Sequence, residues 1–225
     1  MKENLLSTSP WLDNLEYDWR ELEKLGWQID IHKNEFLFHL GDDVKFVYLV
    51  KNGRIRMFLD SMNGQEKAIA IIGKNGLLGE SCVYSENKHI TNAIAATDSR
   101  LVAIPSKLFK QEILKEKHAV QVFEWMSVKT NLLVLQSLYL AFGSSYQRVC
   151  DSIIQLGLTY GEKQGKNKVL IPISFTHQEL ADLIGTTRVT VANHLNNLIG
   201  EGVVSRKKQY YCIEDLSKLT DKLID

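Results

Sequence analysis

The 225-residue chain lacks the features that mark several large classes of protein. Its only cysteines are Cys82, Cys150 and Cys212, and their wide separation predicts reduced, buried thiols rather than a zinc site or an iron–sulfur cluster. No apolar run reaches the roughly 18 residues that a membrane-spanning helix requires. The N-terminus is polar and acidic, without the hydrophobic segment of a signal peptide. We therefore expect a cytoplasmic protein that does not enter a membrane.

Signatures of catalysis and of cofactor binding are missing as well. The six histidines show neither an HExxH motif nor an i, i+4 pair. The glycine-rich stretch from Gly73 to Gly79 does not end in the Gly-Lys-Ser/Thr of a phosphate-binding loop. No Ser/His/Asp or Cys/His set has the spacing of a known catalytic centre. We predict no enzyme activity, no metal and no bound cofactor.

The composition is that of a folded protein, and its charge is balanced overall but not locally. Basic and acidic residues both number 27, and hydrophobic residues make up 44% of the chain, which excludes a disordered chain. Between Lys163 and Gln209, however, seven basic residues stand against three acidic ones. This excess is compatible with a phosphate-binding surface and equally with an ordinary solvated face.

The first half of the chain is predicted to consist mainly of short strands. Residues from Pro10 to Gly26 have apolar spacings of three and four, which predict a short amphipathic helix. Five strand-like runs follow, and the pairs Asn52-Gly53 and Asn63-Gly64 between them predict tight hairpins. The runs cover residues 35–40, 46–50, 54–59, 67–72 and 100–104. This pattern favours a sandwich, roll or barrel, followed by a helix that Ser106 would cap.

A long helix is predicted from Lys117 to Phe142, because this segment contains neither glycine nor proline. Apolar residues recur every seven positions along it, which favours pairing with the same helix of a second chain. The alternative is a helix that packs only on its own domain. The predicted dimer interface consists of Val122, Met126, Thr130, Leu133 and Leu140. Gly143 then breaks the helix, and Ser144 and Gln147 have the spacing of a capping box at the start of the next one.

The segment from Thr176 to Leu198 predicts a helix–turn–helix. Thr176 and Glu179 have capping-box spacing, and Gly185 permits a sharp turn before a second helix that begins near Arg188. Strand-like residues 203–206 and 210–213 predict a two-stranded wing. Polar groups at the start of the second helix are typical of a recognition helix in the major groove. The predicted DNA contacts are Thr176, Thr187, Arg188, Val189, Thr190, Asn193, Lys207 and Lys208.

Over essentially its whole length the sequence resembles the Crp/Fnr family of bacterial transcription regulators. The helix–turn–helix matches the family motif at Gln178-Glu179, Gly185, Arg188, Thr190-Val191 and Leu195. The resemblance implies an α+β fold with a cyclic-nucleotide-binding-like β-roll in residues 1–116, a dimerisation helix and hinge in residues 117–143, and a winged helix–turn–helix in residues 144–225. It also implies a homodimer, double-stranded DNA with a palindromic operator, RNA polymerase and a small-molecule effector as partners.

The effector site implied by the resemblance departs from that of the nucleotide-binding members. Leu78-Gly79-Glu80 matches the start of the family's phosphate-binding cassette, in which the glutamate binds the ribose. The Arg-Ser pair that holds the phosphate is replaced by Ile90-Thr91, and a buried phosphate requires a cation. The positions that approach the base are the apolar Leu133 and Val134. The resemblance therefore implies an apolar or aromatic effector bound near Gly79, Glu80, Ile90, Thr91, Leu133 and Val134.

One branch of the family gives a more specific expectation. Trp11, Trp19 and Trp27, together with residues 189–191, are similar to the branch that senses chlorinated phenols. Asn193 departs from it, because that branch carries arginine there. Tryptophans are also common core residues, so the alternatives of a cyclic-nucleotide-responsive regulator and of a constitutive or redox-responsive one stay open.

Overall fold

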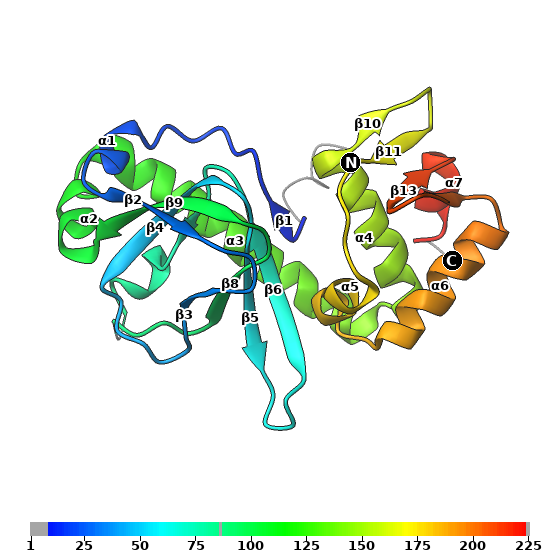
Figure 1. Ribbon diagram of the computed structural model, residues 1–225, viewed down its shortest axis with the longest axis horizontal. Coiled ribbons are helices and arrows are strands. Elements are labelled where there is room, and N and C mark those ends of the chain that lie inside the picture. The colour runs from blue at the N-terminus through cyan, green and yellow to red at the C-terminus, as the bar shows by residue number, and fades with distance from the viewer. Residues whose placement is uncertain (1–8, 86, 224–225) are drawn as a thin grey trace. The chain divides into compact units, whose positions relative to one another are not determined.

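The computed structural model describes residues 9–85 and 87–223, which form two compact units (Figure 1). The first unit comprises residues 11–130, and the second comprises residues 131–223 with the two described residues before position 11. The boundary falls inside the long helix α3 (Glu116–Phe142). The fold is α+β, as predicted, and the three-part division at residues 116/117 and 143/144 stays a prediction.

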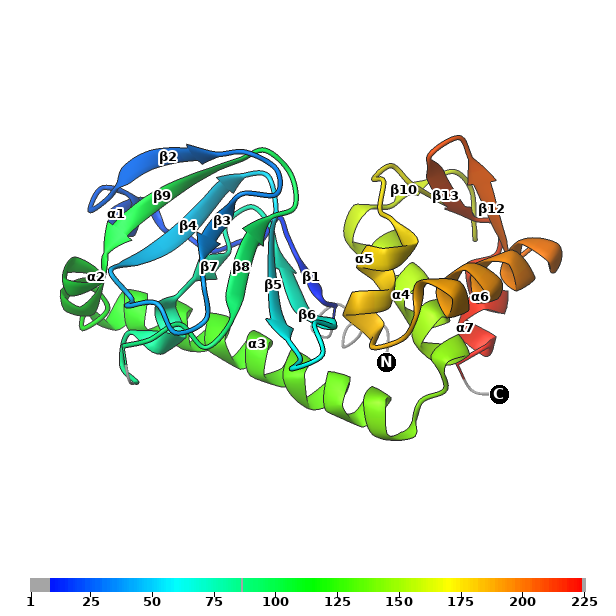
Figure 2. The ribbon, with the colours of Figure 1, turned by 60° about the horizontal axis from the view of Figure 1, so that its bottom comes forward.

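The first unit is a roll of two sheets, visible in Figure 2. One sheet has the order β1-β6-β5-β8-β3 and the other the order β2-β9-β4-β7. The strands are β1 (Trp11–Leu12), β2 (Trp27–Ile31), β3 (Phe36–Phe38), β4 (Phe46–Asn52), β5 (Ile55–Asp60), β6 (Glu66–Ile72), β7 (Leu77–Leu78), β8 (Asn92–Ala95) and β9 (Ser99–Pro105). Within β4, the buried Val47 and Leu49 alternate with the half-buried Phe46 and Tyr48, so one face of the strand lies in the core.

The helix predicted from Pro10 to Gly26 is largely wrong. Only α1 (Arg20–Glu23) is helical, whereas Trp11 and Leu12 form β1, which pairs in parallel with the end of β6. Trp11, Leu12, Trp19 and Leu22 of this segment are buried, Leu22 at 0% exposure, whereas Leu15 and Leu25 are half-buried. The spacing therefore indicated burial correctly, but backbone pairing to a sheet edge overrode the helical periodicity.

The two Asn-Gly pairs have different roles. Asn63-Gly64 lies in the β5–β6 hairpin, with Gly64 at a φ of 73°, as predicted. Gly53 also has a positive φ, of 86°, but β4 and β5 belong to different sheets, so this turn carries the chain between sheets and the hairpin prediction is wrong. Ser106 is the first residue of α2 (Ser106–Glu112) and not its cap, because Pro105 occupies the cap position.

The second unit contains the predicted helix–turn–helix. Its elements are α4 (Ser145–Tyr160), β10 (Glu162–Lys163), β11 (Val169–Ile171), α5 (His177–Ile184), α6 (Arg188–Gly200), β12 (Val204–Lys207), β13 (Tyr210–Ile213) and α7 (Leu216–Asp221). The wing is wider than predicted, because β12 and β13 join β11 and β10 in a four-stranded sheet. The capping box predicted at Ser144 and Gln147 is present at the start of α4.

The cysteines are free and buried, as predicted. Burial raises the pKa of the Cys150 thiol to about 11 and also raises the pKa of Cys212, so both thiols stay protonated at neutral pH. Among residues 9–85 and 87–223, no group of three or more His, Cys, Asp or Glu side chains is placed to hold a metal ion. No helix in the described part of the chain is long and apolar enough to cross a membrane.

Candidate nucleic-acid interface and effector site

Local hydrogen bonds and apolar packing hold α5 and α6 in place. The Thr176 hydroxyl accepts the Glu179 amide at 3.0 Å, while the Glu179 carboxylate accepts the Thr176 amide at 2.7 Å. Gly185, at a φ of 68°, ends α5 in the left-handed conformation that favours glycine. The helices are fixed by their buried residues Leu180, Ala181, Leu183, Ile184, Val191, Leu195 and Leu198. The result is a rigid frame for the first turn of α6.

The first turn of α6 leaves its outer side chains in solvent. Arg188 and Asn193 are exposed, and the apolar Val189 is 67% exposed. The hydroxyl of Thr187 accepts the Thr190 amide at 3.1 Å, so Thr187 caps the helix, just as Thr176 caps α5. Arg188, Val189 and Asn193 have no such capping role and remain available for an outside partner.

The structure adds a group of residues that the sequence reasoning missed. His177, the first residue of α5, lies with its Nε2 atom 2.8 Å from the hydroxyl of Tyr211 on β13. The Arg206 guanidinium lies 5.9 Å from the centre of the Tyr211 ring. Burial and the positive charges of Arg206 and Arg188 lower the pKa of His177. A histidine at the first position of a capped helix was the available signal, but the pairing with Tyr211 spans 34 residues and needs the tertiary fold.

The wing carries less free positive charge than the sequence count indicated. Lys168 forms an ion pair with Glu214, which lies just beyond the counted segment. Lys207 and Lys208 are exposed at the tip of the β12–β13 hairpin, where Lys208 has a φ of 58°. The unpaired positive charge of this surface therefore comes mainly from Lys207 and Lys208 at the tip and from Arg206 beside them.

In the first unit, Glu80 is a fully buried charge with one partner. Gly79, at a φ of 85°, turns the chain into a short 3-10 helix (Glu80–Cys82). The Glu80 side chain is 0% exposed, and its Oε1 atom lies 2.7 Å from Nζ of Lys129 on α3. The Lys129 ammonium also lies 5.4 Å from the centre of the Trp125 ring. Glu80 Oε2 is buried without a hydrogen-bond partner among the described residues.

The other predicted effector residues are only partly brought together. Thr91 is buried, but Ile90 is 63% exposed and therefore does not line the interior of the roll. The preceding residue, His89, is buried instead of Ile90, and its ring stacks on Phe38 at a centroid distance of 3.6 Å. Burial lowers the pKa of His89, although Asp42 opposes that effect, so the ring is neutral at pH 7. Leu133 and Val134 are exposed and belong to the other compact unit, so their part in an effector site stays a prediction.

Two lysines near the cassette, Lys88 and Lys129, are both paired with carboxylates and are therefore not free to bind a phosphate. Lys88 pairs with Asp43 at 2.6 Å, and the Lys129 charge is taken up by Glu80. A Cβ atom at Gly79 would lie 3.1 Å from Cε1 of His89, so this imidazole occupies the space beside the glycine. The group packed beside Gly79 is therefore a neutral aromatic ring and not a cation.

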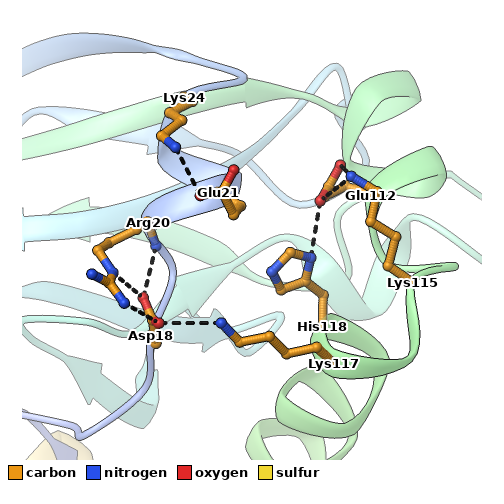
Figure 3. A network of polar contacts seen from close by, with 8 residues as sticks. All are labelled: Asp18, Arg20, Glu21, Lys24, Glu112, Lys115, Lys117 and His118. Atoms are coloured by element: carbon orange, nitrogen blue, oxygen red, sulfur yellow. Dashed lines mark hydrogen bonds and ion pairs between the residues drawn. The ribbon is translucent and has the colours of Figure 1, made fainter.

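A network of polar contacts ties the start of α3 to α1 and α2 (Figure 3). Asp18 accepts hydrogen bonds from Arg20 at 2.8 Å and from Lys117 at 3.3 Å. Hydrogen bonds from Arg20 hold the pKa of Asp18 well below its usual range. The buried Nδ1 atom of His118 lies 3.0 Å from Glu112 at the end of α2. These contacts fix where the long helix begins.

Helix α3 is apolar on more than one side. Val122, Trp125 and Leu132 are buried, so Val122 does not belong to a surface that could meet a second chain. Of the other predicted interface residues, Thr130, Leu133 and Leu140 are exposed and Met126 is half-buried. Additional exposed apolar residues on this helix are Val120, Phe123, Val134, Leu138 and Phe142. Such a set is unusual for a solvent-facing helix surface.

Comparison with known proteins gives consistent results. Residues 28–116 match a model of the cyclic nucleotide-binding domain, and residues 147–222 match a model of the Crp-like helix-turn-helix domain. The Cyclic AMP receptor protein of Thermus thermophilus is 30% identical over 173 residues, which cover 75% of this chain and 74% of that protein. The Anaerobic regulatory protein of Bacillus subtilis is 27% identical over 188 residues, or 82% of this chain and 78% of that protein.

A solved structure with the same fold is that of CprK complexed with OCPA. It superposes with a TM-score of 0.74 at 19% identity, and the match covers 94% of this chain and 99% of that chain. At this identity the likeness concerns the fold alone.

Proposed function

Because this chain belongs to the Crp/Fnr family of ligand-responsive transcription regulators, we propose that it reads a palindromic operator as a homodimer under the control of a small apolar or aromatic molecule. The observation that carries the DNA-reading part is the first turn of α6. There, Arg188 and Val189 are exposed on a helix whose opposite face is buried and whose start is capped by Thr187.

The side chains suggest a role for each DNA contact. Arg188 can donate two hydrogen bonds to a guanine, Val189 can contact a thymine methyl group, and Asn193 can pair with an adenine. The remaining residues carry hydroxyl or ammonium groups suited to the phosphate backbone. These are Thr176, Thr187, Thr190, Lys207 and Lys208.

The operator can be determined directly. The full-length protein would be used to select binding sequences from a pool of random DNA duplexes. The expected product is a near-palindrome whose half-sites lie about one helical turn apart. Failure to enrich any sequence, or enrichment of a sequence without two-fold symmetry, would contradict the proposal.

The homodimer proposal rests on the exposed apolar surface of α3. Met126, Thr130, Leu133 and Leu140 stay in the proposed interface, and Phe123, at 70% exposure, replaces the buried Val122. Pairing two copies of this helix would remove the exposed apolar side chains from water, which is favourable by about 25 cal/mol per Å² of apolar area. The same symmetry would present two α6 helices to the two halves of a palindrome.

The effector proposal rests on the surroundings of Glu80. A cyclic nucleotide would bring a phosphate to a region where the Lys88 charge is neutralised by Asp43 and the Lys129 charge by Glu80. A hydroxyl or weakly acidic group on an apolar ligand could instead donate to the unpaired Oε2 atom of Glu80. This reasoning favours an uncharged or weakly acidic organic effector near Gly79, Glu80 and Thr91.

A cyclic nucleotide is the second candidate effector. It is favoured by the match of residues 28–116 to the cyclic nucleotide-binding domain and by a relative named Cyclic AMP receptor protein. Calorimetric titration of the full chain with cyclic AMP and with a chlorinated phenol distinguishes the two. Heat from the phenol alone supports the first candidate, and heat from cyclic AMP alone supports the second. Full operator affinity without either would indicate a constitutive regulator.

The remaining partners and the cellular location follow from the family. A transcription regulator acts where DNA and RNA polymerase are found, so we include RNA polymerase as a partner and the cytoplasm as the location. Copurification of the polymerase with the protein on a promoter fragment that carries the selected operator would support this contact, and its absence on that fragment would argue against it.

A further inference from the structure

Three elements of the second unit bring basic side chains together near one buried tyrosine. His177 comes from α5, Arg188 from α6 and Arg206 from β12. Tyr211, which is 4% exposed, joins them through its hydrogen bond to His177 and through its ring below Arg206. Phe175 stacks on the same ring at 5.3 Å. The tyrosine therefore holds the imidazole in a fixed position at the N-terminal end of α5.

No acidic side chain neutralises this cluster within the described part of the chain. Arg188 and Arg206 form no ion pair with any described residue, and the Arg206 guanidinium donates to the backbone carbonyl of Lys208. The carboxylate of Glu179, on the same helix as His177, accepts the Thr176 amide. The charged groups that act on His177 are thus Arg206 and Arg188, and both disfavour a proton on its ring.

We propose that His177, held by Tyr211 and flanked by Arg206, binds a backbone phosphate of DNA and takes up a proton when it does so. The proposal goes beyond base reading by Arg188, because it concerns a contact that is independent of DNA sequence. The negative charge of a phosphate would offset the positive charge of this cluster. The positive end of the α5 dipole lies at the same place and favours an anion there as well. The first helix of a helix–turn–helix crosses the DNA backbone, so we expect this cluster at the start of α5 to lie near the phosphates.

The proton balance follows from the hydrogen bond to Tyr211. We assign to the neutral ring the tautomer with its proton on Nδ1, in which the Tyr211 hydroxyl donates to Nε2 across the 2.8 Å contact. When the ring takes a second proton from solvent, Nε2 becomes a donor and the Tyr211 oxygen its acceptor. The bond is kept in both states, so protonation adds charge without moving the imidazole.

The direction of the pH effect can be worked out. In the free protein the pKa of His177 is lowered, so the ring is neutral at pH 7. A bound phosphate favours the charged ring and raises that pKa again. DNA affinity is therefore greatest below the free-state pKa and falls as the pH rises through the pKa of the bound state. Each unit by which DNA raises the pKa weakens binding about tenfold across this range.

The test measures binding of the full chain to a labelled duplex of mixed sequence at pH 6, 7 and 8. For a one-unit shift, His177→Gln should bind like the parent at pH 8 and about three- to fivefold more weakly at pH 6, with the full factor of about ten reached only well below the free-state pKa. His177→Arg should bind with little pH dependence, because its charge is permanent. The salt dependence of the parent at pH 6 should exceed that of His177→Gln by about one counterion for each site.

The matched control is His194→Gln on α6. Burial is the cause that lowers the pKa of His194, whereas the charges of Arg206 and Arg188 also act on His177, and the Nε2 atom of His194 lies 2.9 Å from the Ser145 hydroxyl. This variant should keep the pH dependence of the parent, and circular dichroism should show that all variants are folded. If His177→Gln keeps the parent's pH and salt dependence, the proposal is wrong. Because the probe has no operator, this result does not depend on how Arg188 reads bases.

Discussion

At the scale of single residues, some of the predicted DNA contacts also stabilise the fold, whereas others have no structural partner among the residues that the structure describes. The Thr176 and Thr187 hydroxyls accept backbone amides at helix starts, whereas no ion pair or hydrogen bond joins the Arg188 side chain to another described residue. The Thr176 cap was predicted from sequence, because a capping box is local, whereas Thr187 was predicted only as a DNA contact and its capping role was missed. The partners of Glu80 and His177 could not, since Lys129 and Tyr211 lie 49 and 34 positions away.

Arg188 should be decisive for sequence reading. In Arg188→Ala the bidentate contact to guanine is lost, so operator affinity should fall by about 1–3 kcal/mol per half-site and specificity should relax at one base pair. Competition binding with single-base variants of the selected operator measures this. Arg206→Ala, a matched change beside the proposed phosphate contact of His177, should weaken binding to all duplexes alike. Unchanged discrimination in Arg188→Ala would remove its base-reading role.

The Glu80–Lys129 pair makes a second prediction at this scale. Lys129→Met leaves the fully buried Glu80 carboxylate without a partner, which should cost about 3–5 kcal/mol of stability. All four tryptophans lie in the first unit, at positions 11, 19, 27 and 125, so tryptophan fluorescence during urea unfolding reports on that unit.

Two further variants sharpen this prediction. Adding Glu80→Gln to Lys129→Met should recover much of the loss, because no buried charge is left unpaired. Lys88→Met removes a pair with Asp43 whose side chains are 50% and 59% exposed, so it should change stability by about 0–1 kcal/mol. If Lys129→Met costs no more than Lys88→Met, the buried pair does not support the roll.

At the scale of elements, those with strong local sequence signals were predicted well. Those with weak signals were determined by strand pairing, which the sequence pattern did not show. The long helix was expected from Lys117 to Phe142 and is found from Glu116 to Phe142. The segment around Trp11 failed, because a two-residue strand is defined only by the edge of β6 to which it pairs. The Asn52-Gly53 turn was located correctly, but sheet membership is a long-range property that a turn does not encode.

The exposed surface of α3 predicts how the chain associates. Phe123→Glu places a negative charge on the proposed interface. The same glutamate of the second copy would lie close by, and the repulsion between the two charges should shift the dimer toward monomer. Because Phe123 is 70% exposed, the change does not disturb the core of its own unit. Leu114→Glu is the matched control, since Leu114 is 80% exposed but precedes α3. Sedimentation velocity should separate the two variants, and equal dimer fractions would place the interface elsewhere.

At the scale of the whole molecule, the chain combines a roll with a buried ion pair, a helix with an exposed apolar face and a capped helix–turn–helix with free cations. The first and last of these regions match family models, over residues 28–116 and 147–222. An effector can shift the equilibrium between two states only if it contacts them differently. The sequence could indicate that a regulator is present, but the pairing of Glu80 with Lys129 and the place of His89 beside Gly79 exist only in the folded chain.

In the homodimer proposed above, two copies of this chain read two half-sites on one face of DNA. Hydroxyl-radical footprinting of the full-length protein on the selected operator tests it most directly. We predict two equivalent protected segments about 34 Å apart along the duplex, both weakened by Arg188→Ala. A single protected segment, or two segments that Arg188→Ala leaves unchanged, would contradict it.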